Sequence, residues 1–130
     1  MSIAYVDASA IAKLGLDDAD SVAMTRWFVE AERVLSSRIA VIETRRAVAR
    51  RRPAVVSSSV DRALRSLEIV ELDERIARVA AALEPSSLRT LDAIHLATAL
   101  EIGPIDAFVT YDDRLAEAAR RIGMPVVRPG

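Results

Sequence analysis

The amino-acid sequence predicts an α/β domain in which a mostly parallel sheet of about four to five short strands is flanked by helices on both faces. Two observations support this prediction. Short apolar segments alternate with segments of helical composition from one end of the chain to the other, which is typical of parallel sheets with helical crossovers. The 130 residues contain no internal repeat and no interior linker, so we expect a single domain over residues 1–130.

Five short apolar segments are the predicted strands. The first runs from Ser2 to Val6 and ends at Asp7, which indicates a buried strand that opens into a turn. The other four are residues 34–36, 69–72, 107–110 and 124–127. A strand that is covered on both faces is apolar throughout rather than alternating, and these segments fit that description.

Seven segments between and after these strands have helical composition and recognisable ends. They are residues 8–16, about 20–33, 37–51, 53–67, 73–83, 91–101 and 112–122. We expect Ser37, Asp73 and Thr90 to cap the starts of their helices through side-chain oxygens. Pro53 suits the first turn of the fourth helix, and Val56 belongs to the apolar side of that helix.

Composition excludes several kinds of chemistry. The chain contains no cysteine, which rules out disulfides, thiolate metal sites and cysteine nucleophiles. Its one histidine, His95, rules out chemistry that needs two imidazoles, and its four glycines are too far apart for a phosphate-binding loop. The longest apolar runs are far shorter than the ~20 residues of a membrane span. Residues 1–7 do not resemble a signal peptide, so we expect a cytoplasmic protein without membrane association.

Four acidic residues stand where predicted strands end or neighbouring helices begin. Asp7 follows the first strand, and Glu43 lies in the first turns of the helix after the second. Asp92 opens the helix before the fourth strand, and Asp112 follows that strand. Ligands of parallel α/β sheets bind beyond the carboxyl ends of the strands, so these acids can meet at one edge. Mg²⁺ or Mn²⁺ relieves the repulsion of clustered carboxylates and can promote phosphodiester hydrolysis. The alternative is that such acids only cap helices.

Three segments resemble the motifs of the PIN domain family. Residues 5–13 (YVDASAIAK) are similar to its opening motif, residues 88–97 (LRTLDAIHLA) to its central acidic motif, and residues 108–115 (FVTYDDRL) to its late Thr-x-Asp motif. Glu43 stands where the second acid of the family is expected. The order, spacing and total length resemble VapC-type ribonuclease toxins over nearly the whole chain. The resemblance implies a PIN-like three-layer domain.

The resemblance further implies a Mg²⁺- or Mn²⁺-dependent endoribonuclease whose acidic centre is built from the four acids. Asp7 and Asp92 are the expected direct metal ligands. Glu43 and Asp112 are expected to bind the metal, directly or through water, or to position the attacking water. The Thr-x-Asp spacing favours Asp112 over Asp113 as the fourth acid, which leaves Asp113 as the expected helix cap.

Several other polar residues have roles that the sequence leaves as expectations. On the resemblance, Ser9 and Thr110 support the acids through hydrogen bonds. Arg46 and Arg50 are spaced to share a helix face with Glu43, so they either lead RNA to the acids or form a solvated helix end. His95 is expected to be a packed histidine rather than a catalytic one.

Partners follow from the resemblance alone. It implies an RNA substrate, a homodimer and a cognate antitoxin of the VapB kind. Met24, Trp27 and Phe28 are expected in the core, with an apolar groove for an antitoxin helix as the alternative. Two rival functions remain open: a metal-dependent phosphatase or DNA nuclease that uses the same acids, and a catalytically silent module that binds RNA or protein.

Overall fold

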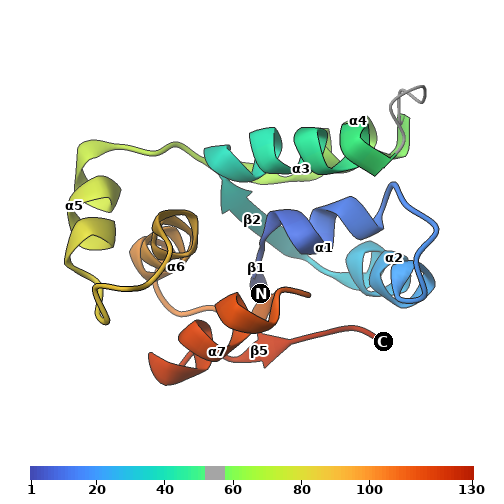
Figure 1. The fold of residues 1–130 in the computed structure, drawn as a ribbon. Helices are drawn as coiled ribbons and strands as arrows, with labels where there is room; N and C mark the ends of the chain where they lie inside the picture. The colour runs from blue at the N-terminus through green and yellow to red at the C-terminus, as the bar shows by residue number, and fades with distance from the viewer. Residues whose placement is uncertain (52–57) are drawn as a thin grey trace.

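A computed structural model describes residues 1–51 and 58–130 (Figure 1). Its centre is a sheet of five strands in the order β3-β2-β1-β4-β5, and every pairing in it is parallel. The strands are β1 (Ile3–Val6), β2 (Arg33–Ser37), β3 (Glu68–Val70), β4 (Ala107–Val109) and β5 (Val126–Val127). The predicted α/β class and parallel sheet are therefore confirmed.

Helices cover both faces of this sheet. They are α1 (Ala8–Lys13), α2 (Ser21–Glu30), α3 (Arg38–Arg51), α4 (Ser58–Ser66), α5 (Glu74–Ala82), α6 (Thr90–Ile102) and α7 (Asp113–Arg121). Figure 1 shows α1 to α4 gathered apart from α5 to α7. Helices α1 and α3 pack against each other, and so do α5 and α6. The sheet and its two helical layers form the three-layer arrangement that the sequence predicts.

The strand period divides the core into two apolar clusters, one on each face. Val6 and Val109 belong to the cluster beneath α1 to α4, whereas Tyr5 and Phe108 belong to the cluster beneath α6 and α7. Successive side chains of a strand point to opposite faces, so adjacent residues of β1 and β4 enter different clusters. Met24 is fully buried in the first cluster, and this confirms its predicted place in the core.

Some predicted boundaries were wrong by a few residues. Helix α2 ends at Glu30 rather than near Arg33, because Arg33 already pairs with Ile3 at the start of β2. Thr90 does not cap α6: the cap position is Arg89, and no side chain makes a capping hydrogen bond there. Asp73 does cap α5, accepting a hydrogen bond from the Ile76 backbone. The roles predicted for Pro53 and Val56 fall outside the described residues.

The carboxyl ends of β1 and β4 place two of the predicted acids at the same end of the sheet. Strand β1 leads into Asp7, which is the N-cap of α1 and accepts a hydrogen bond from the Ala10 backbone at 3.0 Å. Strand β4 leads through Thr110 to Asp112, the N-cap of α7. None of the helices in the described part of the chain is long and apolar enough to span a membrane.

Candidate active site

The four predicted acids line one cavity of about 220 Å³ at the carboxyl side of the sheet. They come from four separate parts of the fold: the end of β1, the second turn of α3, the first turn of α6 and the start of α7. Ser9, Arg50 and His95 line the same cavity. The topology therefore brings together residues that lie more than one hundred positions apart in the chain.

Asp7 is the most deeply buried of the four acids, with 4% of its surface exposed. Its Oδ1 accepts hydrogen bonds from the Ser9 hydroxyl at 2.7 Å and from the Ala10 backbone at 3.0 Å. Its Oδ2 accepts one from the Thr110 hydroxyl at 2.7 Å. Burial raises the pKa of this carboxyl, although nearby His95 and these hydrogen bonds oppose the increase. A buried carboxylate held only by neutral donors gains strongly from an added cation.

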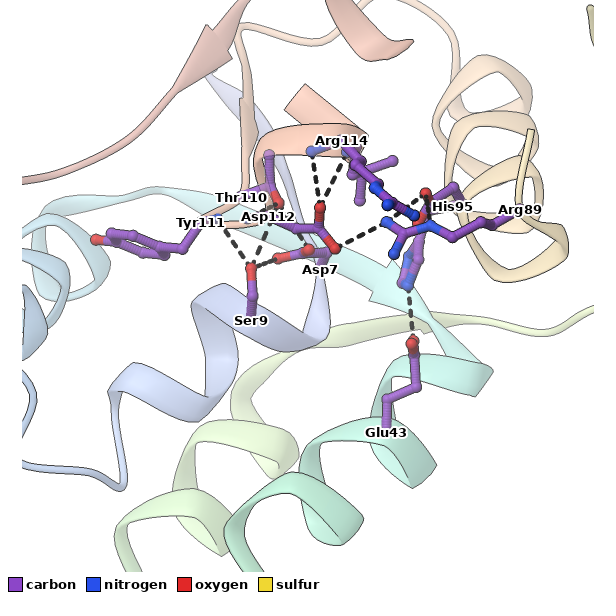
Figure 2. Close-up of polar contacts among 11 residues, drawn as sticks. Asp7, Ser9, Glu43, Arg89, His95, Thr110, Tyr111, Asp112 and Arg114 are labelled. Atoms are coloured by element: carbon purple, nitrogen blue, oxygen red, sulfur yellow. Dashed lines mark hydrogen bonds and ion pairs between the residues drawn. The ribbon is translucent and has the colours of Figure 1, made fainter. Parts of the chain in front are cut away.

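The hydroxyls of Ser9 and Thr110 also organise the turn that follows β4 (Figure 2). Ser9 Oγ accepts a hydrogen bond from the Tyr111 backbone at 2.8 Å, and Thr110 Oγ1 accepts one from the Asp112 backbone at 3.0 Å. Each hydroxyl thus connects Asp7 to the segment that carries Asp112. Their contribution to activity stays a prediction.

Arg89 bridges Asp92 and Asp112, and the sequence analysis missed it. Its Nε donates to Asp92 Oδ2 at 2.7 Å, and its Nη2 donates to Asp112 Oδ2 at 3.0 Å. Figure 2 shows the guanidinium reaching from the start of α6 toward Asp112. The three-residue spacing between Arg89 and Asp92 is a local signal for such a pair. The contact with Asp112 has no local signal.

Asp112 has two functions in the structure, and this corrects the prediction for its neighbour. Its Oδ1 caps α7 by accepting hydrogen bonds from the Arg114 and Leu115 backbones, while Oδ2 faces Arg89. Burial raises the pKa of this carboxyl, but the hydrogen bonds from Leu115 and Arg89 outweigh it, so the pKa lies below its ordinary value. Asp113, predicted to be the cap, instead has a 90% exposed side chain paired with Arg128 at 2.7 Å.

His95 and Glu43 form a contact that the sequence analysis did not foresee. His95 is 2% exposed, and its Nε2 lies 2.7 Å from Glu43 Oε1. Its Nδ1 lies 2.6 Å from the Tyr5 hydroxyl. The expected packed histidine is therefore buried as predicted, but it is hydrogen-bonded to one of the site acids. The three-residue spacing between Asp92 and His95 indicates that the two share a helix face, but it does not predict the contact with Glu43.

The whole arrangement matches a known family. The sequence model of the PIN domain matches residues 4–121, from β1 to the end of α7. This chain belongs to the PIN domain family. The matched region contains all four acids of the cavity and the two hydroxyl groups, of Ser9 and Thr110, that donate to Asp7.

Curated relatives and solved structures agree with this membership. Ribonuclease VapC46 of Mycobacterium tuberculosis is 38% identical over 130 residues, which are 99% of each chain. Ribonuclease VapC35 of the same species is 38% identical over 131 residues, 97% of this chain and 96% of that protein.

The fold of this PIN domain is also similar to solved structures. It matches M. tuberculosis VapC20, described as a sarcin-ricin loop cleaving toxin, with a TM-score of 0.75 at 20% identity over 97% of this chain and 99% of that one. It matches a toxin-antitoxin complex from Klebsiella pneumoniae with a TM-score of 0.70 at 22% identity over 98% of each chain. At these identities the similarity establishes the fold alone.

The donor set of the PIN domain suits a hard divalent cation, because carboxylate oxygens are the ligands that Mg²⁺ and Mn²⁺ prefer. As the side chains lie, however, no three acidic or histidine groups in residues 1–51 and 58–130 converge closely enough to hold an ion. Arg89 occupies the space between two of the carboxylates and supplies one positive charge to both. The residues therefore fit a metal by chemistry and location, and Arg89 lies between two of the carboxylates that would hold it.

Two arginines extend from the PIN domain cavity along α3. Arg50 lines the acidic cavity itself, and Arg46 and Arg50 both line an adjoining groove of about 410 Å³ that also includes Glu43. Both arginines are exposed. The predicted common face with Glu43 is present, and RNA binding along it stays a prediction.

Proposed function

We propose that this PIN domain is a Mg²⁺- or Mn²⁺-dependent endoribonuclease of the VapC type, neutralised by a cognate antitoxin. The observation that carries the proposal is the shared cavity: four acids from four distant segments face one space at the carboxyl side of a parallel sheet. Full-length similarity to two proteins named as ribonucleases supports RNA as the substrate. The acids carry the chemistry because the chain has no cysteine and only one histidine.

The four acids and the two supporting hydroxyls have defined tasks in this proposal. Asp7 and Asp92 would hold the metal ion, with Glu43 and Asp112 as further ligands or as acceptors that orient the attacking water. When bound, the ion supplies charge neutralisation and Lewis acidity for attack on a phosphodiester. Ser9 and Thr110 hold the Asp7 carboxylate in one orientation.

Two arginines, Arg50 and Arg89, complement this acidic centre. Arg50 stands at the wall of the cavity, where its guanidinium can pair with an RNA phosphate. Arg89 would have to leave its place between Asp92 and Asp112 for a dication to bind there, and its charge would then be free to contact the anionic substrate.

An antitoxin partner and a homodimer belong to the same proposal. One structural relative is a toxin-antitoxin complex from Klebsiella pneumoniae, and this supports a protein partner that silences the enzyme. A small reading frame beside this gene whose product co-purifies with the chain and blocks RNA cleavage is the expected result. Light scattering of the purified chain checks for a dimer. The cytoplasmic location stays a prediction from the sequence.

The decisive experiment removes the charges of the two innermost acids and compares them with a matched exposed acid. We expect the Asp7→Asn, Asp92→Asn double variant to lose cleavage of single-stranded RNA by more than about 100-fold, the scale on which one transition-state-stabilising group acts. Asp113→Asn is the control, because Asp113 lies beside Asp112 in sequence but points to solvent. It should cleave like the wild type. EDTA should stop cleavage, and added Mn²⁺ should restore it.

Other outcomes of the same assay would contradict the proposal. Full cleavage by a folded double variant would remove the acids from the mechanism. Faster turnover of single-stranded DNA or of a small phosphate ester than of RNA would favour a DNA nuclease or phosphatase. A wild-type chain that shows no heat of Mn²⁺ binding and no cleavage would favour a silent binding module.

A further inference from the structure

We infer that His95 is a positioning residue for the acidic centre: it relays a hydrogen bond from the Tyr5 hydroxyl to Glu43 and so holds the Glu43 carboxylate at the wall of the cavity. The inference rests on the proposed metal-dependent nuclease function, since it assigns a purpose to the orientation of Glu43. It adds an interior polar chain to a site otherwise made of acids and hydroxyls.

The relay connects three elements of the fold. Tyr5 comes from β1, Glu43 from α3 and His95 from α6. The contact between Tyr5 Oη and His95 Nδ1 is 2.6 Å, and that between His95 Nε2 and Glu43 Oε1 is 2.7 Å. Figure 2 shows the Glu43 side chain pointing from α3 toward the ring of His95. The His95 contact uses only one oxygen of Glu43, and the Glu43 side chain also lines the cavity.

The chemistry of the three groups sets the direction of the hydrogen bonds. A carboxylate only accepts, so the hydrogen between His95 and Glu43 must lie on Nε2. With a single hydrogen on the ring, Nδ1 is then the acceptor and Tyr5 is its donor. A phenol that faces such an acceptor donates its own hydrogen, and the 2.6 Å contact fits a hydrogen bond from Tyr5 to His95. This one tautomer satisfies both hydrogen bonds of the relay.

Aromatic packing holds the imidazole in place. The rings of Tyr5 and Phe108 stack at 5.2 Å with an interplanar angle of 17°, and the His95 ring meets Tyr5 edge-on at 5.8 Å. Tyr5 and Phe108 are fully buried. The histidine ring is thus fixed by the core, whereas the Glu43 side chain is 28% exposed and has three rotatable bonds of its own. The rigid partner restricts the flexible one, as second-layer hydrogen bonds commonly do at metal sites.

A buried histidine can also be no more than a satisfied core residue, and two substitutions separate these readings. The amide nitrogen of glutamine reaches the position of Nε2, whereas that of asparagine reaches only the position of Nδ1. His95→Gln therefore keeps a donor for Glu43, and His95→Asn removes it. Both variants lose the aromatic ring, so both should lower the thermal midpoint by similar amounts.

The readout is the affinity of the full chain for Mn²⁺, measured by calorimetry and by the electron paramagnetic resonance of free Mn²⁺. We expect His95→Asn to weaken Mn²⁺ binding by about tenfold or more, which is the usual effect of losing an outer hydrogen-bond partner. His95→Gln should stay close to the wild type. Equal affinities in all three proteins, or equal losses in both variants, would overturn the inference.

A double-variant cycle tests whether the effect passes through Glu43. In a Glu43→Gln background, His95→Asn should cause little further loss of Mn²⁺ affinity, because the group that it positions no longer has a ligating charge. A loss of the same size in both backgrounds would show that His95 acts by another route and would overturn the inference.

The tautomer provides an independent check, because His95 is the only histidine of the chain and its imidazole nitrogens give an unambiguous NMR signal. The hydrogen is expected on Nε2, and a hydrogen on Nδ1 alone would overturn the relay even if the nuclease proposal held. A wild-type chain without Mn²⁺ affinity would instead overturn both. The two failures are therefore distinguishable.

Discussion

Two aspartates at opposite ends of α1 have opposite electrostatic environments. Asp7 caps the start of the helix and receives hydrogen bonds from two hydroxyls and one backbone N–H. Asp18 follows the other end and pairs with Lys13 at 3.0 Å and with Arg51 at 2.7 Å. Burial raises the pKa of Asp7, whereas hydrogen bonds from Arg51 and Lys13 lower that of Asp18 to about 2.

The difference separates a carboxylate that is neutralised within the fold from one that, under the proposed function, is neutralised by a bound cation. The charge of Asp18 is neutralised within the chain, where its two ion pairs join α1 to the end of α3. The charge of Asp7 is buried without an ion pair to any lysine or arginine that the structure describes, which is costly unless a cation arrives from outside. Energetically unfavourable arrangements of this kind are concentrated at functional sites. The turn containing Asp18 is an ion-pair junction between α1 and α3.

The largest effect should come from removing the charge of each of these two aspartates in a separate variant. Asp7→Asn is expected to reduce RNA cleavage by more than about 100-fold while the free energy of unfolding stays equal or rises, because a buried charge is removed. Asp18→Asn should leave cleavage intact and lower the free energy of unfolding by about 1 kcal/mol. Urea denaturation beside the RNA assay measures both. The comparison fails if Asp7→Asn is the more destabilising change.

A smaller effect is expected where a cation of the chain already sits between site acids. Arg89→Gln removes the guanidinium that bridges Asp92 and Asp112, so Mn²⁺ should bind more tightly in the absence of RNA. We expect a gain of about two- to fivefold, which corresponds to a partly exposed ion pair of up to about 1 kcal/mol. Arg121→Gln, whose charge pairs with Glu117 on α7, is the matched control. Weaker Mn²⁺ binding by Arg89→Gln would mean that Arg89 orders the site instead of competing for it.

Acidity should weaken the Asp18 junction in a defined pH window. The pKa of Asp18 is about 2 in the folded chain against an ordinary 3.8, so its stabilising contribution is complete above about pH 4 and is lost as the pH falls toward 2. Asp7 acts in the opposite direction, because its raised pKa makes the folded chain bind a proton more readily. The difference in unfolding free energy between the wild type and Asp18→Asn isolates the junction. It should shrink from about 1 kcal/mol at pH 5 toward zero near pH 2.

The smallest effect concerns the basic groove beside the cavity. Arg50→Ala should weaken RNA binding and reduce the slope of log K against log salt by about 0.7, the value for one phosphate contact on a single strand. Arg45→Ala is the control, because Arg45 lies on the same helix but pairs with Asp61. Filter binding with Ca²⁺ in place of Mn²⁺, across several salt concentrations, gives both slopes. Equal slopes for the two variants would remove Arg50 from the RNA path.

Local sequence patterns predicted where the strands and helices lie in the chain better than which of them pack or pair with each other. The apolar runs identified every strand, because strands covered on both faces contain few polar residues. The order β3-β2-β1-β4-β5 depends on pairings such as Ile3 with Arg33 and Ala4 with Ala107, which no local pattern encodes. Helix ends were predicted where a side chain makes the cap, as at Asp73, and missed where none does, as at Arg89.

The site residues show the same difference between what local patterns predict and what they do not. Motif spacing selected the four acids that line the cavity, and it favoured Asp112 over Asp113. It did not show that one Asp112 oxygen caps α7 while the other faces Arg89, because a cap and a site residue have the same local signature. The contact of His95 with Glu43 joins residues 52 positions apart and arises only when α3 and α6 reach the same end of the sheet.

The hydrogen bond from Thr110 to Asp7 spans 103 positions of the chain. Strand β1 is made about one hundred residues before its neighbour β4 and the Thr110 hydroxyl, so this pocket closes only after β4 has been made. An emerging chain therefore carries the first acid long before it has an assembled centre, and a fragment that stops before β4 has none. The strand order therefore makes the synthesis of β4 a precondition for the assembly of this pocket.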